Sequence, residues 1–296
     1  MLTGEAATRI DSITEKVFEF CNQRVQILGQ LIQPKLSIGV ALYPQHGNSG
    51  EELISNADLA MYKAKRTASG KIVFENAIAE QRNAQLEIEN GLREAIETNA
   101  FELWYQPKVD VSDGSIAGVE ALVRWRNRSG ELVSPSTFIP VAEHAGLIKD
   151  IGTWVLNAAC EQLEVWRLAG YSLQMAVNIS GDQFSNDGFV ADVNRAINDF
   201  QIEAENLEIE ITESLSRDPE LHIRTCRALR DLGVKVAIDD FGTGYSSLSV
   251  LGQLEVDTLK IDQSFITPLP QDQVSCLMVK KITELALGLG LSLIHI

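Results

Sequence analysis

The sequence predicts an α/β protein: a (β/α)8, TIM-like barrel preceded by a small α+β segment. From residue 101 onward, short apolar strands alternate with helical stretches, which is typical of a parallel sheet wrapped by helices. No G-x-G-x-x-G follows the first of these strands, which favours a barrel over a Rossmann-type sheet. Several strands also carry ionisable residues near their C-terminal ends, which in a barrel converge on one mouth.

The segment before the barrel has its own pattern, which predicts a small α+β unit over 1–75 and a linker helix over 76–99. Apolar residues recur at helical spacing early in the chain, and then alternate as they do in a strand. The expected elements are a helix over 5–32, a strand over 36–43, a helix over 49–66, a short strand over 72–74 and the charged amphipathic linker helix.

The barrel segment over 100–296 contains six strand patterns and four intervening helical patterns. The strands are expected at 101–109, 116–125, 174–179, 207–212, 235–240 and 258–262. The helices are expected near 151–169, 186–200, 218–232 and 246–253.

Composition and charge exclude several classes of protein. The chain has 296 residues, 45% of them hydrophobic, so it is expected to be globular rather than disordered. Its 41 acidic against 25 basic residues give a net charge of −16, which disfavours binding to a nucleic acid polymer. No apolar run approaches the roughly 20 residues of a membrane span, and the first residues do not resemble a signal peptide.

The cysteines and histidines are scattered. The sequence has four cysteines without a C-x-x-C pair and four isolated histidines. This spacing argues against a zinc site and against a disulfide framework, and is typical of proteins of the reducing cytoplasm.

A series of polar residues lies near the C-terminal ends of the predicted strands. They are Glu120, Arg124, Asn178, Glu210, Asp239, Asp240, Lys260 and Asp262. Two cations cannot neutralise so many gathered carboxylates. An oxygen-rich cluster without Cys or His favours Mg²⁺ or Mn²⁺, and there are enough carboxylates for two ions that share one aspartate, an arrangement suited to phosphodiester cleavage. Glu208, by contrast, is expected to be solvent-exposed or salt-bridged.

Together with its neighbours, the string EALVRW from Glu120 resembles the EAL family, the cyclic di-GMP phosphodiesterases. The other family blocks follow over about residues 86–291: YQP precedes it at Tyr105, and after it come PSTFIPVAE at Pro135, NIS at Asn178, EITES at Glu210, DDFGTGYSS at Asp239 and LKID at Leu259. The N-terminal segment resembles the C-terminal half of a GGDEF (diguanylate cyclase) domain, through LSIGVALYP from Leu36 and ADLAMYKAK from Ala57.

The resemblance to the EAL family implies a role for each matching residue. Glu120, Asn178, Glu210 and Asp239 would bind a first metal ion, and Asp239 would bridge to a second ion held also by Asp240. Lys260 would steady the attacking water or the phosphate, and Asp262 would orient a water of the second metal. Gln106 and Arg124 would hold the substrate phosphates, and Glu213 would support the loop over 239–247. Cyclic di-GMP is the implied ligand, and a homodimer through the EAL-like domain is the implied assembly.

The resemblance also implies that the chain is a piece of a longer protein. The GG-[DE]-EF signature is absent, so the remnant is expected to be a structural or dimerising cap rather than a cyclase. In the family the barrel continues past Gly290 into a strand ending in V-A-E-G-V-E, which supplies a glutamate that acts as general base or second-metal ligand. Here Ile296 falls at about the place of that glutamate, and residues 291–296 have the character of an assembly or cloning scar. We therefore expect a barrel truncated at its C-terminal end, and a weak catalyst.

Two alternatives to the enzyme stay open on the sequence. One is a catalytically inactive cyclic di-GMP receptor, for which Gln106, Arg124 and residues 135–143 would suffice. The other is a non-functional fragment whose open sheet edge invites aggregation. We expect a cytoplasmic location, although the parent protein could be membrane-anchored through a preceding segment.

Overall fold

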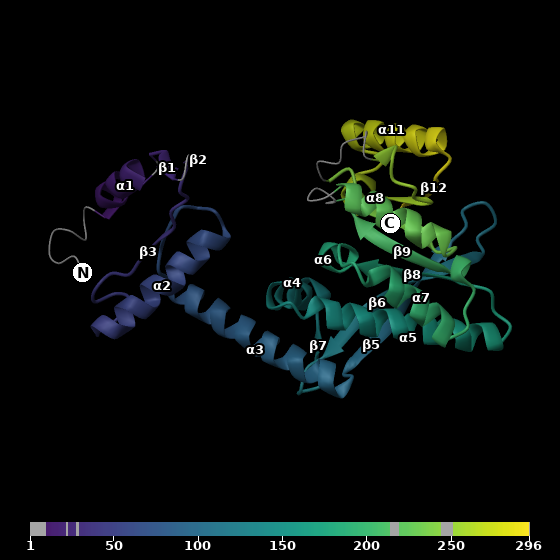
Figure 1. Ribbon diagram of the computed structural model, residues 1–296, viewed down its shortest axis with the longest axis horizontal. Helices are drawn as coiled ribbons and strands as arrows, with labels where there is room; N and C mark the ends of the chain where they lie inside the picture. The colour runs from purple at the N-terminus through teal and green to yellow at the C-terminus, as the bar shows by residue number, and fades with distance from the viewer. Residues whose placement is uncertain (1–9, 22, 28–29, 214–218, 244–250, 296) are drawn as a thin grey trace. The chain divides into compact units, whose positions relative to one another are not determined.

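A computed structural model describes residues 10–21, 23–27, 30–213, 219–243 and 251–295 (Figure 1). The chain forms two compact units, residues 1–88 and 89–296. The division falls within α3 (Asn76–Thr98), the helix predicted as a linker. Each unit is described by itself.

Unit 1 contains short strands and two helices besides the first half of α3. Its elements are α1 (Ile10–Cys21), β1 (Val25–Ile27), β2 (Gln30–Ile32), β3 (Ile38–Val40), α2 (Gly50–Arg66) and β4 (Lys71–Val73). β3 pairs with β4 in parallel, and α2 begins after Ser49, whose side chain accepts the N–H of Glu52. A small core forms around Ala60, Phe74 and Ile78.

The predicted helix over 5–32 is wrong beyond Cys21. The structure has α1 as far as Cys21, followed by β1 and β2, which pair as an antiparallel hairpin. The apolar residues after position 24 fit a helical period, but Val25 and Ile27 also alternate with Gln26 at the strand period of two. β-branched residues favour the extended form, and pairing between neighbouring strands decided the outcome.

Unit 2 is built on one sheet that contains all six predicted barrel strands. Its strands are β5 (Phe101–Val109), β6 (Ile116–Arg126), β7 (Leu132–Val133), β8 (Gln174–Ile179), β9 (Leu207–Thr212), β10 (Lys235–Phe241), β11 (Thr258–Ile261) and β12 (Ser292–His295). The order across the sheet is β12-β11-β10-β9-β8-β6-β5, with β7 paired to β6. From β6 to β12 the neighbours on this path are parallel, which confirms the barrel-like α/β fold.

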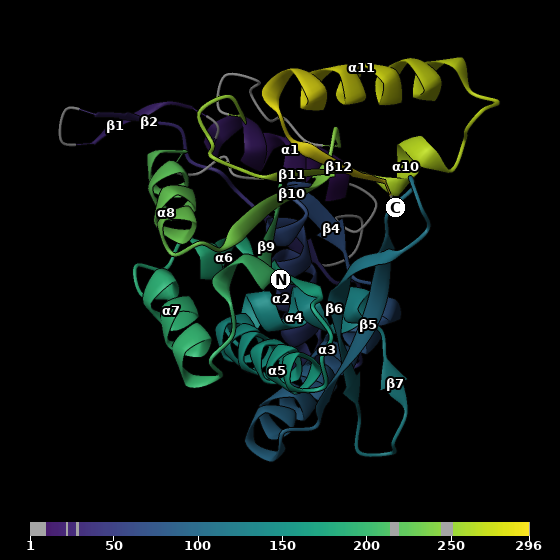
Figure 2. The same cartoon turned by 90° about the vertical axis from the view of Figure 1, so that its right-hand side faces the viewer.

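The sheet curves as an arc, and helices α5 (Ile148–Leu168), α7 (Phe189–Asp199), α8 (Pro219–Asp231) and α11 (Gln273–Leu289) lie along its outer side (Figure 2). The described part of unit 2 also contains α4 (Pro135–Ala145), the short helices α6 (Gly181–Phe184) and α10 (Gln263–Ile266), and a 3-10 turn at Ala204–Asn206. The main core is apolar and lies between the outer face of the sheet and these helices; Val177, Ile209 and Leu259 in it are fully buried.

The first two strands of the sheet depart from a regular βα repeat. β5 and β6 are antiparallel, because only residues 110–115 join them and a parallel pair needs a longer crossover. Their register places Gln106 opposite Glu120 and Lys108 opposite Gly118. Side chains from β5 therefore reach the same inner face as those of the parallel strands.

Two predictions concern the later part of the chain. Most of the helix predicted near 246–253 lies outside the described residues. Residues 292–295 form β12, which pairs in parallel with β11 from Thr258 to Ile261. The expectation that the chain is a truncated piece stays a prediction.

Among the helices that the structure describes, none is long and apolar enough to cross a bilayer.

Candidate metal centre

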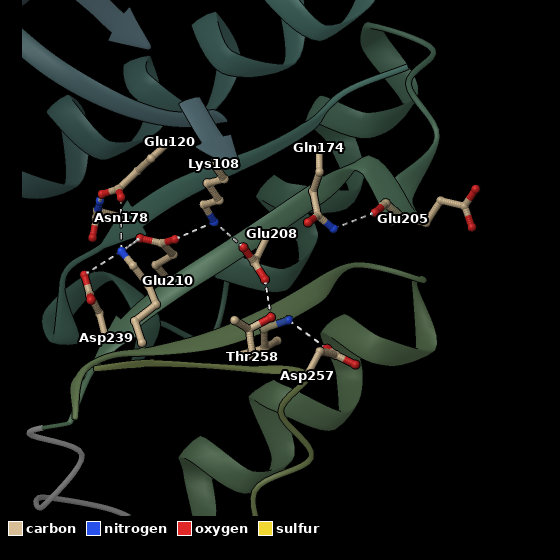
Figure 3. A network of polar contacts seen from close by, with 12 residues as sticks. Lys108, Glu120, Gln174, Asn178, Glu205, Glu208, Glu210, Asp239, Asp257 and Thr258 are labelled. Carbon is tan, nitrogen blue, oxygen red and sulfur yellow. Dashed lines mark hydrogen bonds and ion pairs between the residues drawn. The ribbon is translucent and has the colours of Figure 1, made fainter. Parts of the chain in front are cut away.

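Five of the predicted site residues meet on the inner face of the sheet, as the contacts of Lys260 and Asn178 with the carboxylates show. Figure 3 labels four of the five, all except Lys260. They are Glu120 on β6, Asn178 on β8, Glu210 on β9, Asp239 on β10 and Lys260 on β11. Strand alternation brings them there: in β9, Ile209 and Ile211 take the outer, helix-covered face, so Glu210 between them faces inward. Five different strands thus each contribute one polar side chain.

Lys260 joins the carboxylates of this group. Its Nζ lies 2.5 Å from Glu210 Oε2, 3.1 Å from Glu120 Oε2 and 3.1 Å from Asp239 Oδ2. The Lys260 side chain is only 1% exposed. Burial opposes its charge, but the three carboxylates outweigh burial and raise the pKa of Lys260 above its ordinary value. The lysine is therefore a permanent cation at the centre of the cluster.

The donor set fits a hard divalent cation. One carboxylate oxygen each from Glu120, Glu210 and Asp239 lies within 4.8 Å of the others. Asn178 adjoins them, and its Nδ2 donates to Glu120 Oε1 at 2.6 Å. Rotation of the Asn178 amide by 180° would turn its Oδ1 toward the carboxylates in place of Nδ2. Three carboxylates and one amide are ligands that Mg²⁺ and Mn²⁺ prefer.

Glu210 is the most buried of these carboxylates. Its pKa is raised to about 7: burial, the largest cause, and the charge of Glu120 raise the pKa, and together they outweigh the ammonium groups of Lys108 and Lys260, which lower it. Because a metal ion competes with protons for a carboxylate, this group links metal affinity to pH near neutrality.

Asp240 and Asp262 form a second acidic pair beside the cluster. Asp240 has a positive φ of 54°, and its N–H donates to Asp239 Oδ1 at 2.9 Å. Burial and the charges of Asp239 and Asp262 raise the pKa of Asp240. Asp262 caps α10, and the hydrogen bond that the Ser264 hydroxyl donates to Asp262 Oδ1 lowers the pKa of Asp262. Asp240 and Asp262 lie outside the group of three carboxylates that meet within 4.8 Å.

Glu213 lies just after β9 and is buried. Its Oε2 accepts the N–H of Gly242 at 2.8 Å, so it holds the chain directly after Asp239 and Asp240. This contact is of the kind expected for a residue that supports the loop over 239–247, of which residues 244–247 lie outside the described residues.

The two predicted phosphate-binding residues lie along β5 and β6. Gln106 is exposed and sits opposite Glu120 in the register. The Arg124 guanidinium stacks 5.1 Å from the centre of the Trp104 ring, and its NH1 donates to the carbonyl of Val123. In the part of the chain that the structure describes, Arg124 forms no ion pair with the carboxylates of the cluster.

Lys108 also belongs to this site, although the sequence pattern did not predict it. Its Nζ lies 2.5 Å from Glu208 Oε2 and 2.9 Å from Glu210 Oε1, so it supplies a second cation to the acidic interior. Glu208 is salt-bridged, which is one of its two expected states, and it is buried rather than exposed. The available signal was the alternation in β5, which puts Lys108 on the same face as Gln106.

Comparison with known proteins places the chain in a family. The EAL domain model matches residues 89–295 and the diguanylate cyclase, GGDEF domain model matches residues 2–71. The chain therefore belongs to the EAL domain family, which confirms the resemblance of the sequence blocks. The three-carboxylate cluster lies wholly within the EAL segment.

Similar sequences occur in bacterial signalling proteins. The chain is 39% identical over 299 residues to the bifunctional diguanylate cyclase/cyclic di-GMP phosphodiesterase MucR of Pseudomonas aeruginosa, a match that covers 99% of the chain and 44% of MucR. It is 39% identical over 266 residues to the signaling protein YkoW of Bacillus subtilis, covering 89% of the chain and 33% of YkoW. The chain thus spans less than half the length of these relatives.

Solved structures show the same fold. A cyclic di-GMP complex of the PaMucR phosphodiesterase matches with a TM-score of 0.68 and 40% identity, over 71% of this chain and 85% of that one. The EAL enzyme Bd1971, in a form bound to cAMP and cyclic di-GMP, matches with a TM-score of 0.69 and 31% identity, over 84% of this chain and 66% of that one.

Proposed function

We propose that this chain hydrolyses cyclic di-GMP to the linear dinucleotide with the help of Mg²⁺ or Mn²⁺. The carrying observation is the group of Glu120, Glu210 and Asp239 around a buried lysine at the C-terminal ends of parallel strands. The likeness to MucR and to the PaMucR complex with cyclic di-GMP supports the choice of substrate.

In this proposal, Glu120, Asn178, Glu210 and Asp239 hold the first ion, and Asp239 and Asp240 hold the second. When bound, such ions lower the pKa of a water and offset charge on the phosphate. Lys260 steadies the attacking water or a phosphate oxygen, and Asp262 orients a water at the same mouth. Gln106 and Arg124 bind the substrate phosphates, while Glu213 keeps Gly242 and the preceding aspartates in place.

The test is cyclic di-GMP turnover by the purified 296-residue chain and by its Glu120→Gln variant, with Mg²⁺ or Mn²⁺, followed by chromatography of the products. Glu120→Gln keeps the size of the side chain but removes one charged ligand of the cluster. We expect the linear dinucleotide from the parent chain, and a loss of about 10²-fold or more in the variant.

Glu284→Gln is the matched control, because Glu284 is an exposed glutamate of helix α11 that pairs with Lys281 on the same helix. Its turnover should equal that of the parent chain. Equal turnover in Glu120→Gln would refute the site. Binding of cyclic di-GMP by the parent chain without any turnover would instead identify a receptor.

Three finer properties belong to the same proposal. We propose a homodimer through the EAL domain, which light scattering of the purified chain would test. We also propose a reducing, cytoplasmic location, which the four free cysteines support. Finally, turnover of cyclic di-GMP by MucR, measured beside that of this chain, would test the expectation that the chain is a weak catalyst.

A further inference from the structure

A second polar layer lies directly beneath the metal cluster, on the same inner face (Figure 3). It contains Lys108 of β5, Glu208 of β9 and Thr258 of β11. Glu208 precedes Glu210 by two residues and Thr258 precedes Lys260 by two, so each lies one strand repeat below a residue of the cluster. The Thr258 hydroxyl donates to Glu208 Oε1 at 2.6 Å, and Lys108 Nζ contacts Glu208 Oε2 at 2.5 Å.

Glu210 connects the two layers through its two oxygens. Oε1 accepts from Lys108 Nζ at 2.9 Å, whereas Oε2 accepts from Lys260 Nζ at 2.5 Å. The Glu210 side chain is fully buried and that of Lys108 is 12% exposed. Water therefore has little access to replace Lys108 as the partner of Oε1.

We propose that Lys108 is a positioning residue that fixes Glu210 as a one-oxygen ligand. This inference rests on the proposed function, because it concerns how Glu210 meets the ion. With Oε1 held from below, only Oε2 faces Glu120 and Asp239, the two carboxylates that share Lys260 with it. Lys108 itself touches neither the ion nor the substrate in this proposal.

The layer below explains how Lys108 is itself held. Glu208 and Glu210 lie on the same face of one strand, roughly 6–7 Å apart along it. Their like charges would drive them apart, and the Lys108 ammonium between them removes that repulsion. The Thr258 hydroxyl donates to the other oxygen of Glu208. In this series of side chains, from Thr258 through Glu208 to Lys108, each contact therefore orients the next residue.

Manganese binding by the purified 296-residue chain tests the proposal, because free Mn²⁺ can be counted by electron paramagnetic resonance without any turnover. Lys108→Met should weaken Mn²⁺ binding by about 10–100-fold, the usual effect of removing a group that orients a metal ligand. Lys108→Arg keeps a cation that can reach both glutamates, so it should retain tighter binding than Lys108→Met. Lys281→Met removes an exposed lysine from α11 and should bind as the parent chain does.

A double variant keeps the test decisive if Lys108→Met does not fold. Lys108→Met combined with Glu208→Gln removes one positive and one negative charge, so the net charge is unchanged and no unpaired Glu208 remains. It still leaves Glu210 Oε1 without its partner, so Mn²⁺ binding should stay weak. Thermal unfolding without metal checks that each variant is folded.

Unchanged Mn²⁺ affinity in folded Lys108→Met or in the double variant would overturn the positioning role. Equal losses in Lys108→Arg and Lys108→Met would also contradict it. A parent chain that neither binds Mn²⁺ nor cleaves cyclic di-GMP would overturn both proposals, whereas a parent chain that does both, beside unaffected Lys108 variants, would overturn this inference alone.

Discussion

At the scale of single residues, Glu210 is where charge and burial are most closely balanced. It is fully buried, it contacts two lysines, and it lies near the carboxylate of Glu120. Burial favours its neutral form, and the ammonium groups favour its charged form. Glu210 therefore gains or loses its proton close to neutral pH.

We expect metal affinity to fall as the pH falls through about 7, the raised pKa of Glu210. Above this pKa the carboxylate is charged and free to bind; below it, a proton must leave first, so affinity drops by about tenfold per pH unit. Mn²⁺ titrations at pH 6 and pH 8 measure the effect. The same affinity at both values would show that Glu210 does not control binding in this range.

The residues of the candidate site could largely be predicted, because strand alternation and the sequence blocks both involve Glu120, Asn178, Glu210, Asp239 and Lys260. Lys108 could not be identified in the same way. Its partners lie 100 and 102 residues away, and no local pattern tells a buried lysine from an exposed one. Only the pairing of β5 with β6 and the curvature of the sheet bring these side chains together.

At the scale of elements, the end of β10 depends on one glycine. Gly242 has a φ of +102°, a conformation that residues with a side chain rarely adopt. A Cβ at this position would also lie 2.8 Å from the Phe265 ring. The glycine therefore allows the chain to turn directly after Asp239 and Asp240 while its N–H reaches Glu213.

Gly242→Ala should lower the free energy of unfolding by about 1–3 kcal/mol, the usual cost of a strained backbone. It should also weaken Mn²⁺ binding, because the turn carries the adjoining aspartates. Denaturant unfolding and Mn²⁺ titration measure the two effects. Gly114→Ala is the control: Gly114 has a positive φ of 74° but open space around it, so it reports strain without the clash.

Strands and helices of unit 2 could be predicted better than those at the start of unit 1. In unit 2, the six predicted strands show apolar residues in short runs or at alternating positions, whereas β7 and β12 were not predicted. After Cys21, the apolar residues fit both a helix and a hairpin, and their spacing alone could not separate the two. The hairpin forms because β1 and β2 hydrogen-bond to each other, and the spacing of apolar residues does not show which strands will pair.

At the scale of the whole molecule, all residues of the candidate site come from unit 2, whereas unit 1 has a core of its own. Gly39 of β3 lies against α2 so closely that a Cβ would come within 1.9 Å of the Ala57 carbonyl oxygen. The packing of unit 1 therefore depends on a bare backbone at this position.

We expect Gly39→Ala to destabilise unit 1 by about 1–3 kcal/mol or more, because the backbone of α2 must move away. Mn²⁺ affinity at the unit 2 site should not change. Calorimetry would follow the unfolding of unit 1, and the Mn²⁺ titration would follow the site. A matching loss of Mn²⁺ affinity would show that the two units are energetically coupled.

Strand β9 has a consequence for how this molecule can vary over generations. Its odd-numbered residues, Leu207, Ile209 and Ile211, belong to the apolar core, and its even-numbered residues, Glu208 and Glu210, belong to the acidic interior. A substitution at an even position can change the chemistry and spare the core. Losing or gaining one residue within the strand would instead exchange the two faces and place carboxylates among the helices. During evolution, β9 can therefore accept substitutions at its even positions, but it cannot accept an insertion or deletion.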